Sequence, residues 1–180
     1  MPVYLAMLRG INVSGQKKIP MAELRTLVED LKFKNVRTYI QSGNVVFETG
    51  ATAHEKLALQ LEKKISSHFK FDVPVIIRTP EEIAKILKKN PFLKEKEIDT
   101  SRLYVTFLKD SPSKELSSKL SAVSFDPDQF IITETEVFLH CPVSYGNSKL
   151  NNNFLENKLK VGATTRNWKS VNELHKMLSE

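Results

Sequence analysis

Two cations near the C-terminus stand where a helix is expected to begin. The segment "GATTRNWKSVNEL" carries Arg166 and Lys169 and has no acidic residue before Glu173. Four apolar residues recur here at helical spacing: Trp168, Val171, Leu174 and Leu178. They predict a helix that begins near Thr165, with a threonine as its cap. The helix dipole opposes cations in the first turn by about 0.3–1 kcal/mol each. An anion is therefore expected there: a bound phosphate, a ligand carboxylate, or an acidic side chain from elsewhere in the fold.

A second basic segment, "LRGINVSGQKKIP", follows the first apolar run of the chain. Gly10 and Gly15 are spaced as in a phosphate-binding P-loop, but Gln16 occupies the lysine position and no hydroxyl residue follows for magnesium. The segment therefore fails as a nucleotide-hydrolase motif. It remains a basic loop able to contact an anion, and the alternative is that its glycines only supply turn conformations. Its candidate contacts are Arg9, Asn12, Lys17 and Lys18.

Polar residues in two further segments complete the predicted ligand-binding set. "QSGN" supplies Ser42 and Asn44 from a hairpin turn, and "YGNSKLNNNF" supplies Ser148 and Lys149 just before a helix. Arg166 and Asn167 come from the C-terminal segment. No general base stands among these residues, so no catalytic residue is assigned, and whether the protein is an enzyme is left open. The neighbours Ser148 and Lys149 are not favoured as a nucleophilic pair, because adjacent residues need not point at each other.

Metal and thiol chemistry find little support in the sequence. The four histidines form no metal-ligand spacing with each other or with Cys141, so neither a metal nor a cofactor is expected. Cys141 is the only cysteine, which excludes an internal disulfide. It follows His140 on a predicted strand, and a buried, inert thiol is expected.

The order of the predicted elements indicates a duplicated fold. The first half reads β-α-β-β-α-β: a strand at 3–8, a helix from Pro20, two strands around the turn 41–44, a helix over about 52–68 and a strand at 73–78. In this topology the loop 9–18 and the turn 41–44 lie at the same end of the sheet. Thr79 and Glu82 form a capping box that opens a short helix, which ends at Asn90 before a charged connector.

The second half repeats β-α-β-β-α, but a helix near Thr165 is predicted in place of the last strand. We therefore predict an α+β fold of two ferredoxin-like βαββαβ halves, the second incomplete and ending in an extra helix. The predicted divisions are a first half at 1–79, a helix and connector at 80–101, and a second half at 102–180.

Five ordered motifs carry a resemblance to a known family: "LRGINVSG", "MAELR", "TYIQSGNVVF", "GNSKL" and "ATTRNW". Together they resemble the bacterial domain-of-unknown-function 1697 family over nearly the whole chain. The resemblance implies a stand-alone bacterial cytoplasmic protein with a duplicated ferredoxin-like arrangement, and it implies no activity. Ser14 stands where a glycine is common in the family, and Lys32 replaces the glycine of an "LGF"-like turn.

Charge and composition bound the function. The 180 residues are 41% hydrophobic and 27% charged, with a net charge of +6. Residues 1–90 carry 15 Lys and Arg against 9 Asp and Glu, whereas residues 91–180 carry 12 of each. This excess suits an anionic partner, although a solvated lysine-rich surface would have the same composition. No apolar run is long enough for a membrane span, and the start lacks the features of a signal peptide, so a cytoplasmic protein without a membrane partner is expected.

Three functions remain open at this point. The first is binding of a phosphate- or carboxylate-bearing ligand such as a nucleotide or nucleic acid. Sequence-specific RNA reading is disfavoured within it, because the chain lacks a strand rich in stacking aromatics. The second is a small-molecule enzyme with a polar cleft between the halves, and the third is a structural or partner-binding protein without a ligand. The sequence indicates neither the ligand nor the oligomeric state.

Overall fold

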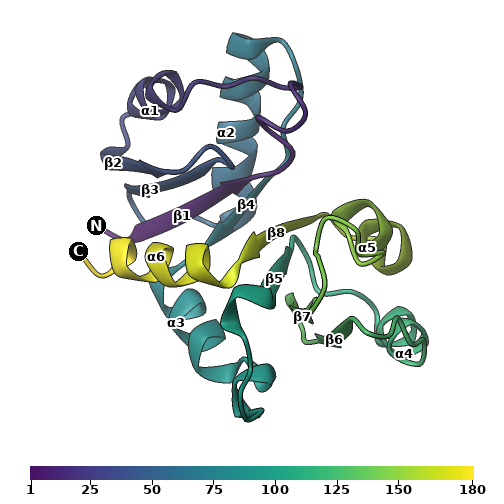
Figure 1. Ribbon diagram of the computed structural model, residues 1–180. Coiled ribbons are helices and arrows are strands. Elements are labelled where there is room, and N and C mark those ends of the chain that lie inside the picture. Colours follow the sequence, from purple (N-terminus) through teal and green to yellow (C-terminus); the bar gives the residue numbers. More distant parts are fainter. The chain divides into compact units, whose positions relative to one another are not determined.

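Seven elements in the first part of the chain build a four-stranded antiparallel sheet and its helices. In chain order they are β1 (Val3–Leu8), α1 (Met21–Glu29), β2 (Lys34–Tyr39), β3 (Asn44–Glu48), α2 (His54–Phe69), β4 (Val75–Arg78) and α3 (Pro80–Lys89). The strands lie in the order β2-β3-β1-β4, and each neighbouring pair is antiparallel. This computed structural model describes residues 1–180 (Figure 1).

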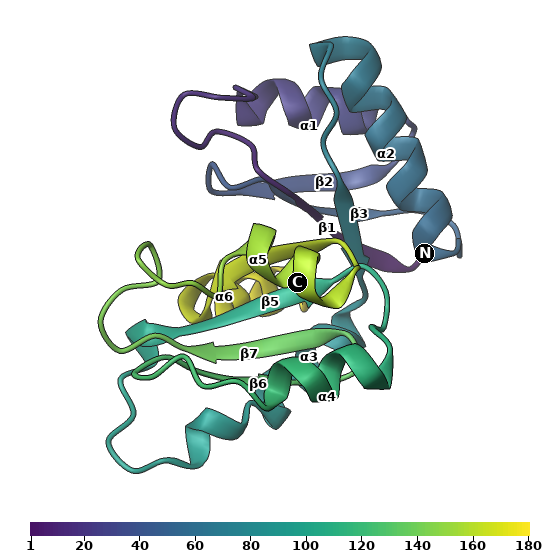
Figure 2. The same ribbon diagram turned by 90° about the vertical axis from the view of Figure 1, so that its right-hand side faces the viewer.

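The remaining elements build a second sheet of the same kind. They are two short 3-10 helices, η1 (Pro91–Lys94) and η2 (Thr100–Arg102), followed by β5 (Leu103–Leu108), α4 (Lys114–Ser121), β6 (Gln129–Ile132), β7 (Glu136–His140), α5 (Asn152–Leu159), β8 (Ala163–Asn167) and α6 (Trp168–Leu178). Their strand order is β6-β7-β5-β8, again antiparallel throughout (Figure 2).

Contacts within the chain divide it into two units. The first unit comprises Met1–Ala84 and Leu174–Glu180, and the second comprises Lys85–Glu173. The division falls inside α3 and inside α6, so each of these helices contributes residues to both units. None of the helices combines the length and the apolar character that crossing a lipid bilayer requires.

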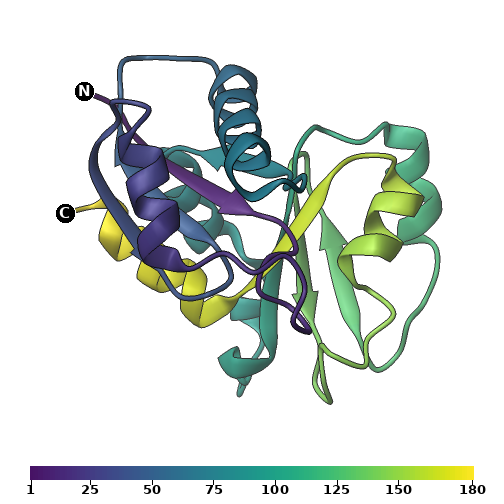
Figure 3. The same cartoon turned by 90° about the horizontal axis from the view of Figure 1, so that it is seen from above.

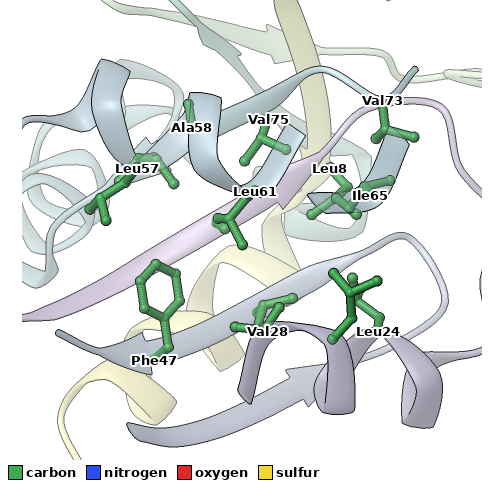
Figure 4. Close-up of a cluster of buried hydrophobic side chains, with 14 of the residues drawn as sticks. Leu8, Leu24, Val28, Phe47, Leu57, Ala58, Leu61, Ile65, Val73 and Val75 are labelled. Atoms are coloured by element: carbon green, nitrogen blue, oxygen red, sulfur yellow. The ribbon is translucent and has the colours of Figure 1, made fainter. Parts of the chain in front are cut away.

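The core of the first unit lies between its sheet and the helices α1 and α2. Alternate residues of β1 face this core, because successive side chains of a strand point to opposite faces. Leu24 and Val28 from α1, Leu61 from α2 and Phe47 of β3 belong to this one cluster (Figure 4). The ring of Phe47 also stacks on Phe33, with centroids 4.7 Å apart.

The core of the second unit is built in the same way from α4, α5 and one face of its sheet. It joins Leu108 of β5 and Leu139 of β7 to Leu155 and Leu159 of α5, all almost fully buried. Cys141 belongs to the same cluster and is inaccessible to solvent. The expected burial of the thiol is therefore confirmed.

The predicted start of the last helix is wrong, and the second sheet has a fourth strand. Residues 163–167 pair with β5, with Arg166 opposite Val105, and the helix begins only at Trp168. Two consecutive threonines favour a strand because they are β-branched, and the ladder with β5 satisfies their backbone. The predicted incompleteness of the second half is thus wrong in this respect. Arg166 also does not lie in the first turn of a helix, so the dipole argument does not apply to it.

Candidate functional site

The segment from Arg9 to Lys18, called the basic loop below, forms a short hairpin between β1 and α1 (Figure 3). The N–H of Asn12 donates to the carbonyl of Lys17 at 3.2 Å, and the N–H of Gln16 donates to the carbonyl of Val13 at 2.9 Å. At its tip Ser14 and Gly15 have φ values of 51° and 72°, both in the left-handed region. Two consecutive positive φ values are typical of a tight hairpin turn, whose two central positions favour glycine or asparagine. Ser14 therefore occupies a position where a glycine would fit without strain.

Asn12 joins the basic loop to the turn between β2 and β3. Its amide nitrogen donates to the carbonyls of Ile19 at 3.0 Å and Gln41 at 2.8 Å, and its Oδ1 accepts from the N–H of Ile19 at 2.8 Å. The predicted neighbourhood of the loop 9–18 and the turn 41–44 is confirmed by these bonds. Asn12 uses every polar atom of its side chain in them, which makes it a positioning residue.

Close packing fixes the turn against the end of β1. The N–H of Leu8 donates to the carbonyl of Gly43 at 2.8 Å. A Cβ at Gly43 would lie 2.6 Å from Ile11 Cδ1 and 2.9 Å from the Cβ of Leu8, and Gly43 has a φ of 86°. Only glycine meets both conditions. The turn therefore forms a fixed support for the basic loop.

The cations of the basic loop have different environments. Lys17 Nζ donates to the carbonyl of Asp72 at 2.6 Å, which ties the loop to the residues before β4. Lys18 is exposed and takes part in no hydrogen bond or ion pair. The side chain of Arg9 is half-buried, and the backbone N–H of Arg9 donates to the carbonyl of Pro74 at 3.0 Å. The loop thus presents one solvated ammonium group beside two cations that are held closer to the fold.

Asn44 and Ser42 act mainly within the turn. Asn44 is fully buried, and its amide nitrogen donates to the carbonyl of Tyr39 and to Ser42 Oγ, both at 3.0 Å. The pair holds the ends of β2 and β3 together. In the first unit, the fold thus brings six of the predicted residues to one end of the sheet: Arg9, Asn12, Lys17, Lys18, Ser42 and Asn44.

In the second unit the predicted residues also have defined partners. Ser148 Oγ donates to Asp128 Oδ2 at 2.7 Å and accepts from the N–H of Leu150 at 3.1 Å, whereas Lys149 is exposed. Asn167 Oδ1 accepts from the N–H of Ser170 at 2.8 Å, so Asn167 caps α6 in place of the predicted threonine. The hydroxyl of Ser148 is therefore engaged with a carboxylate.

Arg166 is buried in the second unit, with 6% of its surface exposed. One guanidinium nitrogen donates to Thr164 Oγ1 at 2.8 Å and to the carbonyl of Thr165 at 3.0 Å. Burial lowers the pKa of Arg166 to about 10, and the charge of the Tyr145 side chain acts in the opposite direction. The guanidinium nevertheless stays protonated at neutral pH.

Sequence reasoning missed a chain of hydroxyl groups on the helix-covered face of the second sheet. The hydroxyls of Thr106 and Thr165 lie 2.7 Å apart, and Thr165 donates to Asn152 Oδ1 at 2.7 Å. Because Thr165 has one proton, Thr106 is the donor in the first bond. The ring of Tyr145 stacks on that of Tyr104, with centroids 4.7 Å apart. Burial raises the pKa of Tyr145, and a hydrogen bond with Thr165 acts in the opposite direction. The one signal was a threonine inside the apolar run "LYVTFL".

The thiol of Cys141 is poorly suited to nucleophilic chemistry. Burial raises its pKa to about 11, the nearby Asp128 adds to this effect, and a hydrogen bond with Ser148 works against it. Only the thiolate attacks electrophiles, and little of it forms at neutral pH.

Two four-stranded antiparallel sheets, each covered by helices on one face, define a mixed α+β protein with an asparagine-fixed basic loop. The protein belongs to the family described as "Protein of unknown function (DUF1697)", whose profile matches residues 1–138. The chain matches none of the curated proteins. A conserved bacterial protein from Streptococcus pneumoniae has a similar structure, with a TM-score of 0.78 and 23% identity over 98% of each chain. That likeness concerns the fold.

Proposed function

We propose that the protein binds an anionic ligand, a phosphate- or carboxylate-bearing molecule such as a nucleotide or nucleic acid, at the basic loop. The observation that carries the proposal is the solvated ammonium group of Lys18 on a loop whose backbone is already fixed. Asn12 and Gly43 hold that loop in one shape, so binding costs little ordering of the chain. Lys17 and Arg9 add positive potential from the same segment.

The shape of the loop backbone supports the same proposal. Positive φ values recur at Gly10, at Asn12, at the adjacent pair Ser14 and Gly15, and at Lys17, with one residue of negative φ between these positions. Sign changes of this kind form anion-binding concavities where the N–H groups are free. The N–H groups of Asn12 and Gln16 are engaged within the hairpin, so an anion would be bound by the other N–H groups of the loop. Non-glycine residues in this region also store strain, which is common at binding sites. The loop leads into α1, whose first turn has no side-chain cap.

A charge-reversal pair tests the site. Lys18→Glu removes the solvated cation, and Lys56→Glu makes the same change of net charge on an exposed lysine of α2. Binding of fluorescent single-stranded DNA and of a labelled nucleotide triphosphate is measured at low and at moderate salt. We expect Lys18→Glu to weaken binding by about tenfold or more, and Lys56→Glu to change it by about twofold or less.

Two results would remove the proposal. Equal losses in the two variants would show that binding depends on net charge and has no defined site. Absence of binding to both probes at low salt, where phosphate contacts are strongest, would exclude phosphate-bearing ligands. A carboxylate ligand is tested by adding citrate and measuring whether it displaces the labelled nucleotide.

We further propose that the chain holds two copies of one ferredoxin-like βαββαβ arrangement, at 1–79 and 102–180, joined by the segment 80–101. Support comes from their equal element order and strand order, and from the matching registers of β1–β3 with β5–β7 and of β1–β4 with β5–β8. Arg78 lies opposite Leu5 in the first sheet as Arg166 lies opposite Val105 in the second. Each arginine is buried and donates at 3.0 Å to the carbonyl of the residue before it.

Two carboxylates repeat in the same way. Glu62 of α2 accepts the N–H of Val75, the first residue of β4, at 3.0 Å. Glu156 of α5 accepts the N–H of Ala163, the first residue of β8, also at 3.0 Å. A glutamate that caps the outward N–H of an edge strand is not required by the topology. Its occurrence at equivalent places therefore favours duplication.

A further inference from the structure

A groove between α4 and α5 in the second unit has an apolar floor and a basic rim. The floor is formed by five side chains: Leu116, Leu120, Val123, Phe125 and Phe154. The rim is formed by three cations: Lys119, Lys158 and Lys160. The groove has a volume of about 450 Å³, within the range of small-molecule sites. It is called the α4–α5 groove below.

The floor of the groove is preorganised by aromatic packing. Phe125 meets Phe154 edge to face, with centroids 5.3 Å apart and planes at 78°. Phe125 also meets Phe130 of β6 at 5.7 Å, so its ring is held from two sides. Val123 is 48% exposed beside these rings. A ligand can therefore cover apolar surface without first ordering it.

The rim of the groove carries charge of one sign. Lys119, Lys158 and Lys160 are exposed, and none of them forms an ion pair. Lys158 Nζ lies 5.8 Å from the centroid of the Phe154 ring, at the boundary of floor and rim. No acidic residue lines the groove. An anionic group placed at this rim would therefore lie among cations and beside no lining carboxylate.

A second hollow next to the groove has the opposite charge. It shares Val123 and Phe125 with the groove but is lined by Glu95 and Asp128 and by no cation. Two hollows that share one aromatic ring are thus lined by charges of opposite sign, although the second half of the sequence is neutral. This sorting argues that the basic rim has a specific complement.

We propose that the α4–α5 groove binds a single-chain amphiphile with an anionic head, such as a fatty-acid carboxylate or an alkyl phosphate. The alkyl chain lies on Phe125 and Phe154, and the head group lies between Lys119 and Lys158. The site is in the second unit and uses no residue of the basic loop. The proposal is therefore independent of the proposed function.

The experiment uses the full chain and four eight-carbon probes. Octanoate and octyl phosphate carry an anionic head, octanol is neutral, and octyltrimethylammonium is cationic. Titrations are followed by calorimetry and by amide chemical shifts around Phe125 and Phe154. We expect both anionic probes to bind and to shift these signals, the neutral probe to bind at least about tenfold more weakly, and the cationic probe not to bind. Equal binding of all four would overturn the proposal, because it would reflect non-specific apolar contact.

Charge reversal at the rim provides the second arm. Lys119→Glu combined with Lys158→Glu should weaken octanoate binding by about tenfold or more and should create binding of octyltrimethylammonium. The control combines Lys114→Glu with Lys94→Glu, two exposed lysines of the same unit outside the groove. It should change either affinity by about twofold or less, as should Lys18→Glu in the basic loop. Equal losses in the rim and control variants would overturn the proposal. So would binding of an acidic amphipathic peptide that octanoate does not displace.

Discussion

Replacing Glu62 tests how the fold protects the free side of β4. Leu8 donates its N–H to Gly43, away from β4, so the pair Leu8–Val75 exchanges no backbone bonds across the β1–β4 ladder. The N–H of Val75 consequently points to the other side, where Glu62 Oε1 accepts it. Val75 is fully buried, so Glu62→Ala leaves a buried donor without its acceptor.

The magnitude follows from the cost of an unsatisfied buried group. Loss of the acceptor is expected to lower the free energy of unfolding by about 1–3 kcal/mol. A chain of this size loses about 2–4 °C of melting temperature per kcal/mol, so the expected decrease is about 2–12 °C. Glu62→Gln keeps an acceptor oxygen and is expected to cost less than about 1 kcal/mol. Glu156 serves Ala163 in the same geometry, so Glu156→Ala should behave alike.

Two measurements check this reasoning. Urea unfolding followed by circular dichroism gives the free energy of unfolding, and hydrogen exchange gives the protection of individual amides. Exchange should accelerate selectively at Val75 in Glu62→Ala and at Ala163 in Glu156→Ala. Unchanged stability together with unchanged protection of Val75 in Glu62→Ala would refute the argument. If Glu62→Gln lost as much stability as Glu62→Ala, the charge and not the acceptor would be responsible.

Two further predictions concern the second unit. Asn167→Ala removes the cap of α6 and should lower the free energy of unfolding by about 1 kcal/mol. Asn167→Asp keeps a capping oxygen and should preserve most of this free energy. Denaturant unfolding measures both variants, and equal losses would contradict a capping role. The pKa of Cys141 is raised from 9.0 to about 11, so at neutral pH alkylation by iodoacetamide should be about 100-fold slower in the folded than in the unfolded chain on thiolate content alone. Because the pKa is higher in the folded than in the unfolded chain, the thiol does not lower the free energy of unfolding below pH 9.0. The free energy of unfolding decreases as the pH rises from 9.0 through about 11. Rapid labelling of the native protein would contradict the burial of this thiol.

Local signals in the sequence predicted much of the first unit. The capping box predicted at Thr79 and Glu82 is present, with the two reciprocal bonds at 2.7 and 3.3 Å. The contact between the basic loop and the turn 41–44 followed from the chain path alone. The partners within that contact did not follow, because Asn12 bonds to Gln41 across 29 positions of sequence.

The C-terminal segment shows why the remainder was not predictable. Trp168, Val171 and Leu174 have a strong helical period, which predicts a helix from about Thr165, but residues 163–167 pair with β5 instead. A five-residue strand with polar side chains has no apolar alternation of its own, so only the partner strand reveals it. The predicted boundary places Arg166 in the first turn of a helix, whereas the observed boundary makes it a buried strand residue.

Charge counted along the sequence also differs from charge sorted in space. The excess of +6 in residues 1–90 favours an anion site in the first half, whereas the neutral charge count of residues 91–180 gives no indication of a basic groove between α4 and α5. The fold nevertheless gathers Lys119 of α4 with Lys158 and Lys160 at the end of α5, while Glu95 and Asp128 line a second hollow that shares Phe125. Since screening confines the interaction of exposed charges to about 10 Å, local grouping decides which ligand a surface attracts. A half with zero net charge can therefore hold a site as selective for anions as a basic half.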